Sequence, residues 1–145
     1  MVVKTLTYKD FDGNERTESF YFNLTPAELV DLQSSLNGGL NQLLDKIVKE
    51  NNQSKIIEYF KKIVLMSYGE KSLDGRNMIK NDKVREDFQS TMAYSDIFME
   101  LATNAEEAAA FVNGIVPPKE EQEKYLKKMQ ALENKGAEVV QMPAK

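Results

Sequence analysis

The chain has 145 residues and a formal net charge of −4, and it contains neither cysteine nor histidine. Without these residues, disulfides, thiolate chemistry and the commonest general base and metal ligand are excluded. The mildly acidic charge disfavours nucleic-acid binding, because affinity for phosphates depends on clustered lysine and arginine. The length suits one domain, no apolar run is long enough to cross a membrane, and the N-terminus lacks an export-signal pattern, so we expect a cytosolic protein.

Residues 2–22 are predicted to form a β-hairpin. Apolar residues alternate with polar ones on both arms, as in a strand with one covered face. On the first arm they are Leu6 and Tyr8, and on the second Phe20 and Phe22.

The turn between these arms, DFDG at residues 10–13, determines the register of the hairpin. A two-residue loop would set even-numbered residues against odd-numbered ones. A type I turn followed by a glycine bulge pairs Asp10 with Asn14, so that even faces even. Only the bulged register places all four apolar side chains on one face, and we therefore favour it.

A helix start is the strongest local signal in the sequence. Thr25 is placed as N-cap, Pro26 at the first helical position, and Glu28 as the partner of a capping box. The helix is predicted to run to about residue 36.

Two further helices are predicted between residues 40 and 68. The apolar residues of the first are Leu40, Leu43, Leu44, Ile47 and Val48. The second is predicted to be capped by Ser54, and its wider apolar face consists of Ile56, Ile57, Phe60, Ile63, Val64 and Tyr68. A wide apolar face indicates the centre of a helical bundle.

Residues 69–81 are predicted to be a loop, with a turn at Asp74-Gly75. A fourth helix is predicted to begin at about Asp82, with Val84 and Phe88 pointing inward.

The stretch from Tyr94 to Pro117 carries two apolar stripes at helical spacing, which core packing explains. The stripes consist of Tyr94, Ile97, Phe98 and Leu101, and of Ala108, Phe111, Val112 and Ile115. One long helix, or two helices hinged at Thr103–Asn104, would produce them. We favour the hinge, because Asn104 suits an N-cap with Glu107 as capping-box partner. Gly114 is predicted to form a left-handed C-terminal cap, and Pro117-Pro118 to stop the helix.

Beyond the double proline, residues 119–134 are dense in charge and predict a helix that frays after Gly136. Two pairs have the stabilising i, i+4 spacing, Glu120–Lys124 and Glu123–Lys127. A narrow apolar stripe is formed by Tyr125, Leu126, Met129 and Leu132. Two interpretations remain open: a solvated helix, or an arm that docks these four residues in a partner's groove.

No group of residues indicates catalysis, so we expect no enzyme activity, metal or cofactor. The SLDGR loop at 72–76 has one glycine where phosphate-binding loops need several, so a solvated turn is favoured. Adjacent glutamates on a helix point apart and cannot share a proton or a metal. No calcium-loop spacing is present.

Three segments carry a resemblance to a known family: KTLTYKDFDGNERTESFYFNLTPAEL at 4–29, SYGEK at 67–71 and AYSDIFMELATNAEEAAAFVNGIVP at 93–117. Together they resemble the tail assembly chaperones of long-tailed (siphovirus-type) bacteriophages. We expect the likeness to extend from about residue 3 to about residue 117, with the tail outside it.

The resemblance implies a chaperone that binds the tape measure protein and keeps it soluble in the host cell cytoplasm, and that is absent from the mature virion. It also implies a longer product of the same gene, made by frameshifting, whose extension recruits the major tail protein. The physics is consistent, since a long helix with one apolar face aggregates unless that face is masked. We also expect weak self-association into homo-oligomers.

The alternative is a phage or prophage regulatory protein-interaction module. A DNA-binding version would need a basic recognition helix, which the sequence lacks. The predicted fold class is therefore mostly α: a compact helical bundle with an N-terminal β-hairpin and a C-terminal helical tail. Residues 1–117 are expected to form the chaperone domain, and residues 118–145 a charged, partly flexible tail.

Overall fold

The computed structural model describes residues 1–35, 45 and 53–141 of the chain. Within these residues the fold is mostly α, and it contains one four-stranded antiparallel sheet with the strand order β1-β2-β3-β4. The elements are β1 Val2–Lys9, β2 Glu15–Phe22, α1 Pro26–Ser35, α3 Gln53–Ser67, β3 Tyr68–Lys71, β4 Met78–Ile79, α4 Asp82–Gln89, α5 Met92–Thr103, α6 Ala105–Ile115 and α7 Lys119–Gln141. The predicted helix bearing Leu40 to Val48 lies outside the described residues.

The β1–β2 hairpin has the predicted register, in which even-numbered residues face even-numbered ones. The N–H of Asp10 donates to the carbonyl of Asn14 at 2.8 Å, and Gly13 adopts a φ of 82°. This left-handed conformation is the one that a glycine bulge requires. The inner face of the hairpin consists of buried Tyr8, Phe20 and Phe22 and half-buried Leu6.

The sheet is larger than the sequence predicted. Residues 69–81 were expected to be a loop, but they form most of the β3–β4 hairpin, and β3 pairs with β2 through Tyr68 and Phe22. Helix α3 therefore ends at Ser67 and does not include Tyr68. The Tyr68 ring stacks on Phe88 at 4.0 Å, a tertiary contact that favours the strand. The predicted Asp74-Gly75 turn is confirmed, with Gly75 at a φ of 77°.

Of the three helix starts predicted from local sequence, two are confirmed and one is wrong. The capping box at α1 is confirmed, since the Thr25 N–H donates to Glu28 at 3.0 Å and the Glu28 N–H donates to the Thr25 hydroxyl at 3.2 Å. Helix α4 begins at Asp82 as predicted, with Val84 and Phe88 buried. Helix α3 begins at Gln53, so Ser54 is a helical residue and not the predicted cap.

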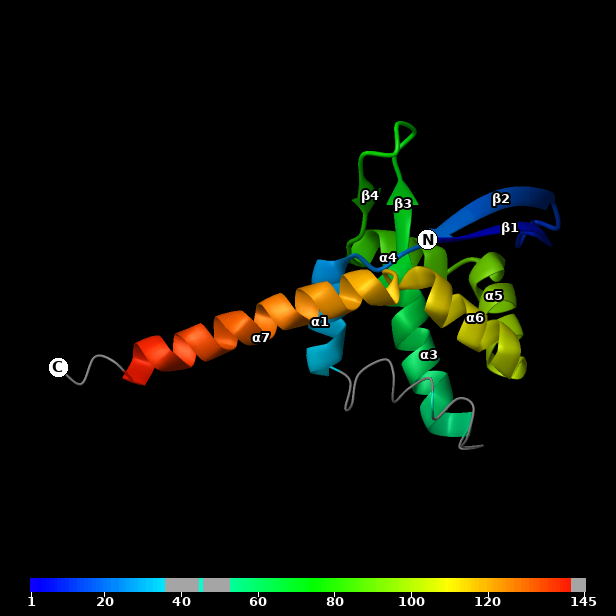
Figure 1. The fold of residues 1–145 in the computed structure, drawn as a ribbon. Coiled ribbons are helices and arrows are strands. Elements are labelled where there is room, and N and C mark those ends of the chain that lie inside the picture. Colours follow the sequence, from blue (N-terminus) through cyan, green and yellow to red (C-terminus); the bar gives the residue numbers. More distant parts are fainter. Residues whose placement is uncertain (36–44, 46–52, 142–145) are drawn as a thin grey trace.

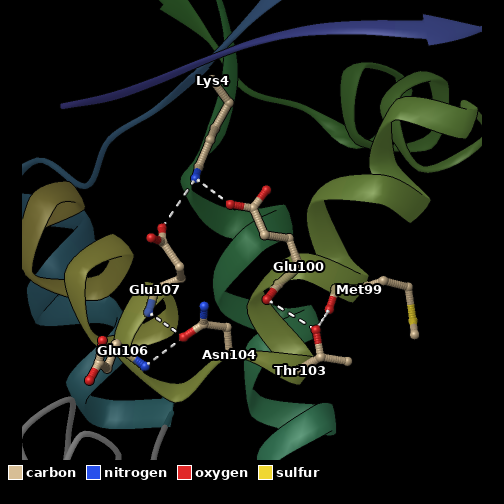
Figure 2. Close-up of polar contacts among 7 residues, drawn as sticks. All are labelled: Lys4, Met99, Glu100, Thr103, Asn104, Glu106 and Glu107. Atoms are coloured by element: carbon tan, nitrogen blue, oxygen red, sulfur yellow. Dashed lines mark hydrogen bonds and ion pairs between the residues drawn. The ribbon is translucent and has the colours of Figure 1, made fainter.

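The predicted hinge between α5 and α6 is confirmed. The side-chain oxygen of Asn104 accepts the N–H groups of Glu106 at 3.1 Å and Glu107 at 3.2 Å (Figure 2). The Glu107 carboxylate does not complete the capping box. It points instead toward the ammonium of Lys4, 4.0 Å away, which also lies 3.5 Å from Glu100. Lys4 of β1 thereby connects the two helices on either side of the hinge.

Gly114 does not form the predicted left-handed cap. It lies inside α6, which ends at Ile115, and Gly13 and Gly75 are the residues with positive φ in the described chain. A Cβ built at Gly114 would lie 2.6 Å from Cγ2 of Val2. Its carbonyl also accepts the N-terminal ammonium at 3.0 Å. Glycine is therefore needed here for the close approach of β1 to α6.

The core lies between the inner face of the sheet and the helices. The Phe22 ring contacts those of Phe88 and Phe111 with centroids 5.8 and 5.2 Å apart, which joins β2 to α4 and α6. Figure 1 shows the two hairpins diverging from this core, and α7 extending away from it past α1. The sequence predicted one hairpin in front of a bundle, whereas two hairpins share one sheet.

Candidate partner-binding surface

Helix α7 begins directly after the double proline and is held at its base. Pro117 is buried, and its carbonyl accepts the side-chain N–H of Gln122 at 2.6 Å. The backbone N–H of Gln122 donates to the carbonyl of Pro118 at 3.0 Å, which forms the first turn. The helix continues to Gln141, past Gly136, after which the sequence predicted fraying.

The base of α7 lies against the start of α1 and beside a hollow at the end of α6. On one side, Tyr125 and Leu126 border a small hollow with residues at the start of α1: Pro26, Leu29 and Val30. On the other side, Leu126 borders a second hollow of about 510 Å³, whose apolar lining includes Val112 and Val116 of the α6 end. The first two residues of the predicted apolar stripe, Tyr125 and Leu126, therefore lie beside α1.

The same stripe is most exposed at its C-terminal residue, Leu132. Tyr125 and Leu126 are 40% and 37% exposed, Met129 is 42% exposed and Leu132 is 64% exposed. Figure 1 shows the helix leaving α1 behind in this direction. The four predicted residues thus lie on one helix, two at its base and two beyond it.

The flanks of the stripe are charged. The Lys128 ammonium lies 5.7 Å from the centre of the Tyr125 ring, a distance at which cation and ring attract. In the described part of α7, neither of the predicted pairs, Glu120–Lys124 and Glu123–Lys127, closes to ion-pair distance. These charges remain directed to water and flank the apolar stripe.

In the described residues, no group of three or more acidic side chains is placed to hold a metal ion, and no helix is long and apolar enough to cross a membrane. In the 72–76 turn, the Asp74 carboxylate accepts the Ser72 hydroxyl at 2.6 Å and the Arg76 N–H at 3.1 Å. These bonds lower the pKa of Asp74 and hold the turn together internally.

Two exposed apolar residues that the sequence did not identify as candidates lie at the tips of the hairpins. Phe11 is 77% exposed at the tip of the first hairpin, and Leu73 is 105% exposed at the tip of the second. Each precedes an Asp-Gly pair whose glycine has positive φ. The shared pattern of an apolar residue followed by Asp-Gly in a turn was the available signal.

The comparisons with known proteins identify the family. A family model described as phage tail assembly chaperone matches residues 1–143. Neither the comparison with curated proteins nor the comparison with solved structures found a match. The family match includes α7, so the expectation that the resemblance stops near residue 117 is wrong. The chain therefore belongs to the phage tail assembly chaperone family.

Proposed function

We propose that this chaperone binds the tape measure protein and keeps it soluble while the phage tail is built, with the exposed part of α7 as a contact surface. The observation that carries the proposal is the apolar stripe of α7, which continues through Met129 and Leu132 beyond its seat on α1. The family match supports it by including α7. The regulatory alternative gains nothing from that match.

A helical client suits this surface. The stripe is narrow and runs along one side of a helix, and such stripes pack against the apolar side of another helix. A tape measure protein with an exposed apolar side would aggregate at high concentration unless that side were covered. The charged flanks of α7 would keep the resulting complex in solution.

Co-expression with the tape measure protein tests the proposal. The double variant Met129→Glu/Leu132→Glu places two charges on exposed positions of the stripe, so folding should be unaffected. We expect most of the tape measure protein to move from the soluble to the pelleted fraction. The matched control is Gln130→Glu/Ala131→Glu, which adds the same charge to exposed positions off the stripe. Equal solubility with both variants would remove α7 from the proposed contact surface.

The proposal extends to place and partners. The chaperone is proposed to act in the host cell cytoplasm and to be absent from the mature virion. A longer frameshifted product of the same gene is proposed to recruit the major tail protein through its extension. Mass spectrometry of infected cells would test for the longer product through peptides of its extension. Mass spectrometry of purified virions would test whether the chaperone is absent from them.

A further inference from the structure

The described sheet has three open strand edges. Strand β4 ends the sheet on one side with only two residues, Met78–Ile79. Strand β2 is paired with β3 only through Tyr21 and Phe22, so the rest of that edge has no strand beside it. Strand β1 forms the other end of the sheet over its full length, Val2–Lys9. Open edges can add a strand from another chain, and proteins normally protect them.

Two of these edges are protected and β1 is not. The edge of β4 is short, and β2 carries three charges along its open part, Glu15, Arg16 and Glu18. Strand β1 has eight residues, no proline and an unbroken register without a bulge. Its Lys4 points inward to Glu100 and Glu107, as Figure 2 shows. An edge with no outward charge before Lys9 is suited to pairing.

The turn determines which backbone groups of β1 are free. The Asp10 N–H bonds to Asn14, so the even-numbered residues of β1 use their backbone groups toward β2. In an antiparallel ladder the direction alternates, and the odd-numbered residues therefore direct N–H and C=O to the open edge. These residues are Val3, Thr5, Thr7 and Lys9.

We propose that β1 pairs antiparallel with β1 of a second copy of this chain, around a two-fold axis at Leu6. Thr5 then faces Thr7 of the second copy, and Val3 faces Lys9. The four pairs supply about eight backbone hydrogen bonds, two for each pair. A two-fold axis makes the contact self-complementary and closes it at a dimer. This inference does not rest on the proposed function.

The charges favour this register over the one with its axis at Thr5. With the axis at Leu6, Lys4 faces Tyr8 and Lys9 faces Val3, so no like charges are opposed. With the axis at Thr5, Lys9 would face the N-terminal ammonium of Met1, and like charges opposite each other destabilise a sheet. A second copy is favoured as the occupant of this edge because β1 complements itself around the two-fold axis.

Cysteine cross-linking tests the register, because the chain has no cysteine of its own. A mixture of Thr5→Cys and Thr7→Cys chains should form mixed disulfide dimers under mild oxidation, since facing residues have suitable Cα spacing. Neither variant alone should do so efficiently. The control mixture, Thr17→Cys with Ser19→Cys, lies on the same face but on β2, and it should remain monomeric.

Sedimentation of the full chain tests the pairing itself. Thr5→Lys/Thr7→Lys opposes lysines across the axis and should weaken dimerisation at least tenfold. The control Thr17→Lys/Ser19→Lys adds the same charge on the same face. Both variants lose the same two side-chain hydrogen bonds, Thr5–Ser19 and Thr7–Thr17, each 2.9 Å long in the native chain. Only the β1 variant should therefore shift the dissociation constant by this amount.

The outcomes separate the alternatives. A chain that is monomeric at every concentration, or two lysine variants with equal effects, would overturn the proposal. Disulfide dimers from Thr5→Cys alone would place the axis at Thr5 and overturn this register. Mixed dimers together with the selective lysine effect support the proposal.

Discussion

The Phe20 side chain is buried on the inner face of β2, where its ring lies 5.4 Å from that of Phe88 and 6.4 Å from those of Tyr8 and Tyr68. We expect Phe20→Ala to lower the free energy of unfolding by about 3–5 kcal/mol, the usual range for truncating a buried phenylalanine. Urea unfolding measures the change. Tyr21→Ala is the control, because Tyr21 points to the outer face. Equal losses would contradict the register.

Glu28 links stability to pH. Burial favours raising the pKa of its carboxyl, but the hydrogen bonds from Lys80 and the Thr25 N–H, with the charge of Lys80, lower it below the ordinary value of 4.5. The Lys80 ammonium lies 2.9 and 2.8 Å from the two carboxylate oxygens and also bonds the carbonyl of Asn23. The negative form is thus favoured in the folded state.

The sign of the pH effect follows from this lowered pKa. The contribution of Glu28 is present above pH 4.5 and is lost as the pH falls through its lower folded pKa. We expect Glu28→Gln to reduce the free energy of unfolding at pH 7 and to reduce its decline between that pH and the acid range. Urea unfolding at several pH values measures both. Glu86→Gln is the control, because Glu86 is exposed. If stability fell with acid as steeply in Glu28→Gln as in the native chain, the linkage would be contradicted.

The α6 helix depends on its contact with β1 at Gly114. We expect Gly114→Ala to destabilise the protein by about 1–3 kcal/mol, because the added methyl group overlaps Val2. Alanine is more favourable than glycine inside a helix. Shortening the Val2 side chain, which the added methyl group overlaps, should therefore restore stability. Val2→Ala/Gly114→Ala should therefore unfold at a higher urea concentration than Gly114→Ala alone. If the double variant were no more stable than Gly114→Ala, the backbone conformation at residue 114, and not the overlap with Val2, would explain the need for glycine.

The whole molecule shows how much α7 contributes to the fold. The buried residues of the core extend from Tyr8 to Ile115, upstream of the double proline. We therefore expect a chain truncated after Pro118 to unfold cooperatively, with a loss of about 1–2 kcal/mol because Tyr125 and Leu126 no longer cover α1. Circular dichroism in urea measures this. A truncated chain without a cooperative transition would make α7 part of the core.

The truncation also separates folding from function. We expect the truncated chain to fail to keep the tape measure protein soluble in co-expression. The double variant Tyr125→Ala/Leu126→Ala is the control for the lost packing, since it uncovers the same part of α1 but keeps Met129 and Leu132. Full client solubility with the truncated chain would show that the client contacts another surface.

Features that depend on neighbouring residues could be predicted from the sequence. The alternation in β1 and β2 and the DFDG turn predicted the hairpin register, because a bulged turn relates residues only a few positions apart. The caps at Thr25 and Asn104 are also local, since their side chains bond N–H groups within three residues. The apolar stripe of α7 was found in the same way, by helical spacing alone.

Tertiary structure decided the features that join distant segments. Strands β3 and β4 are too short to show a period. Strand β3 forms because Tyr68 pairs with Phe22, which lies 46 positions earlier in the chain. Gly114 matched a cap in sequence, but the approach of Val2 determines its role. Lys4 carried no signal until folding placed Glu100 and Glu107 beside it. Such contacts depend on which surfaces meet when the chain closes on itself, and neighbouring residues do not encode that.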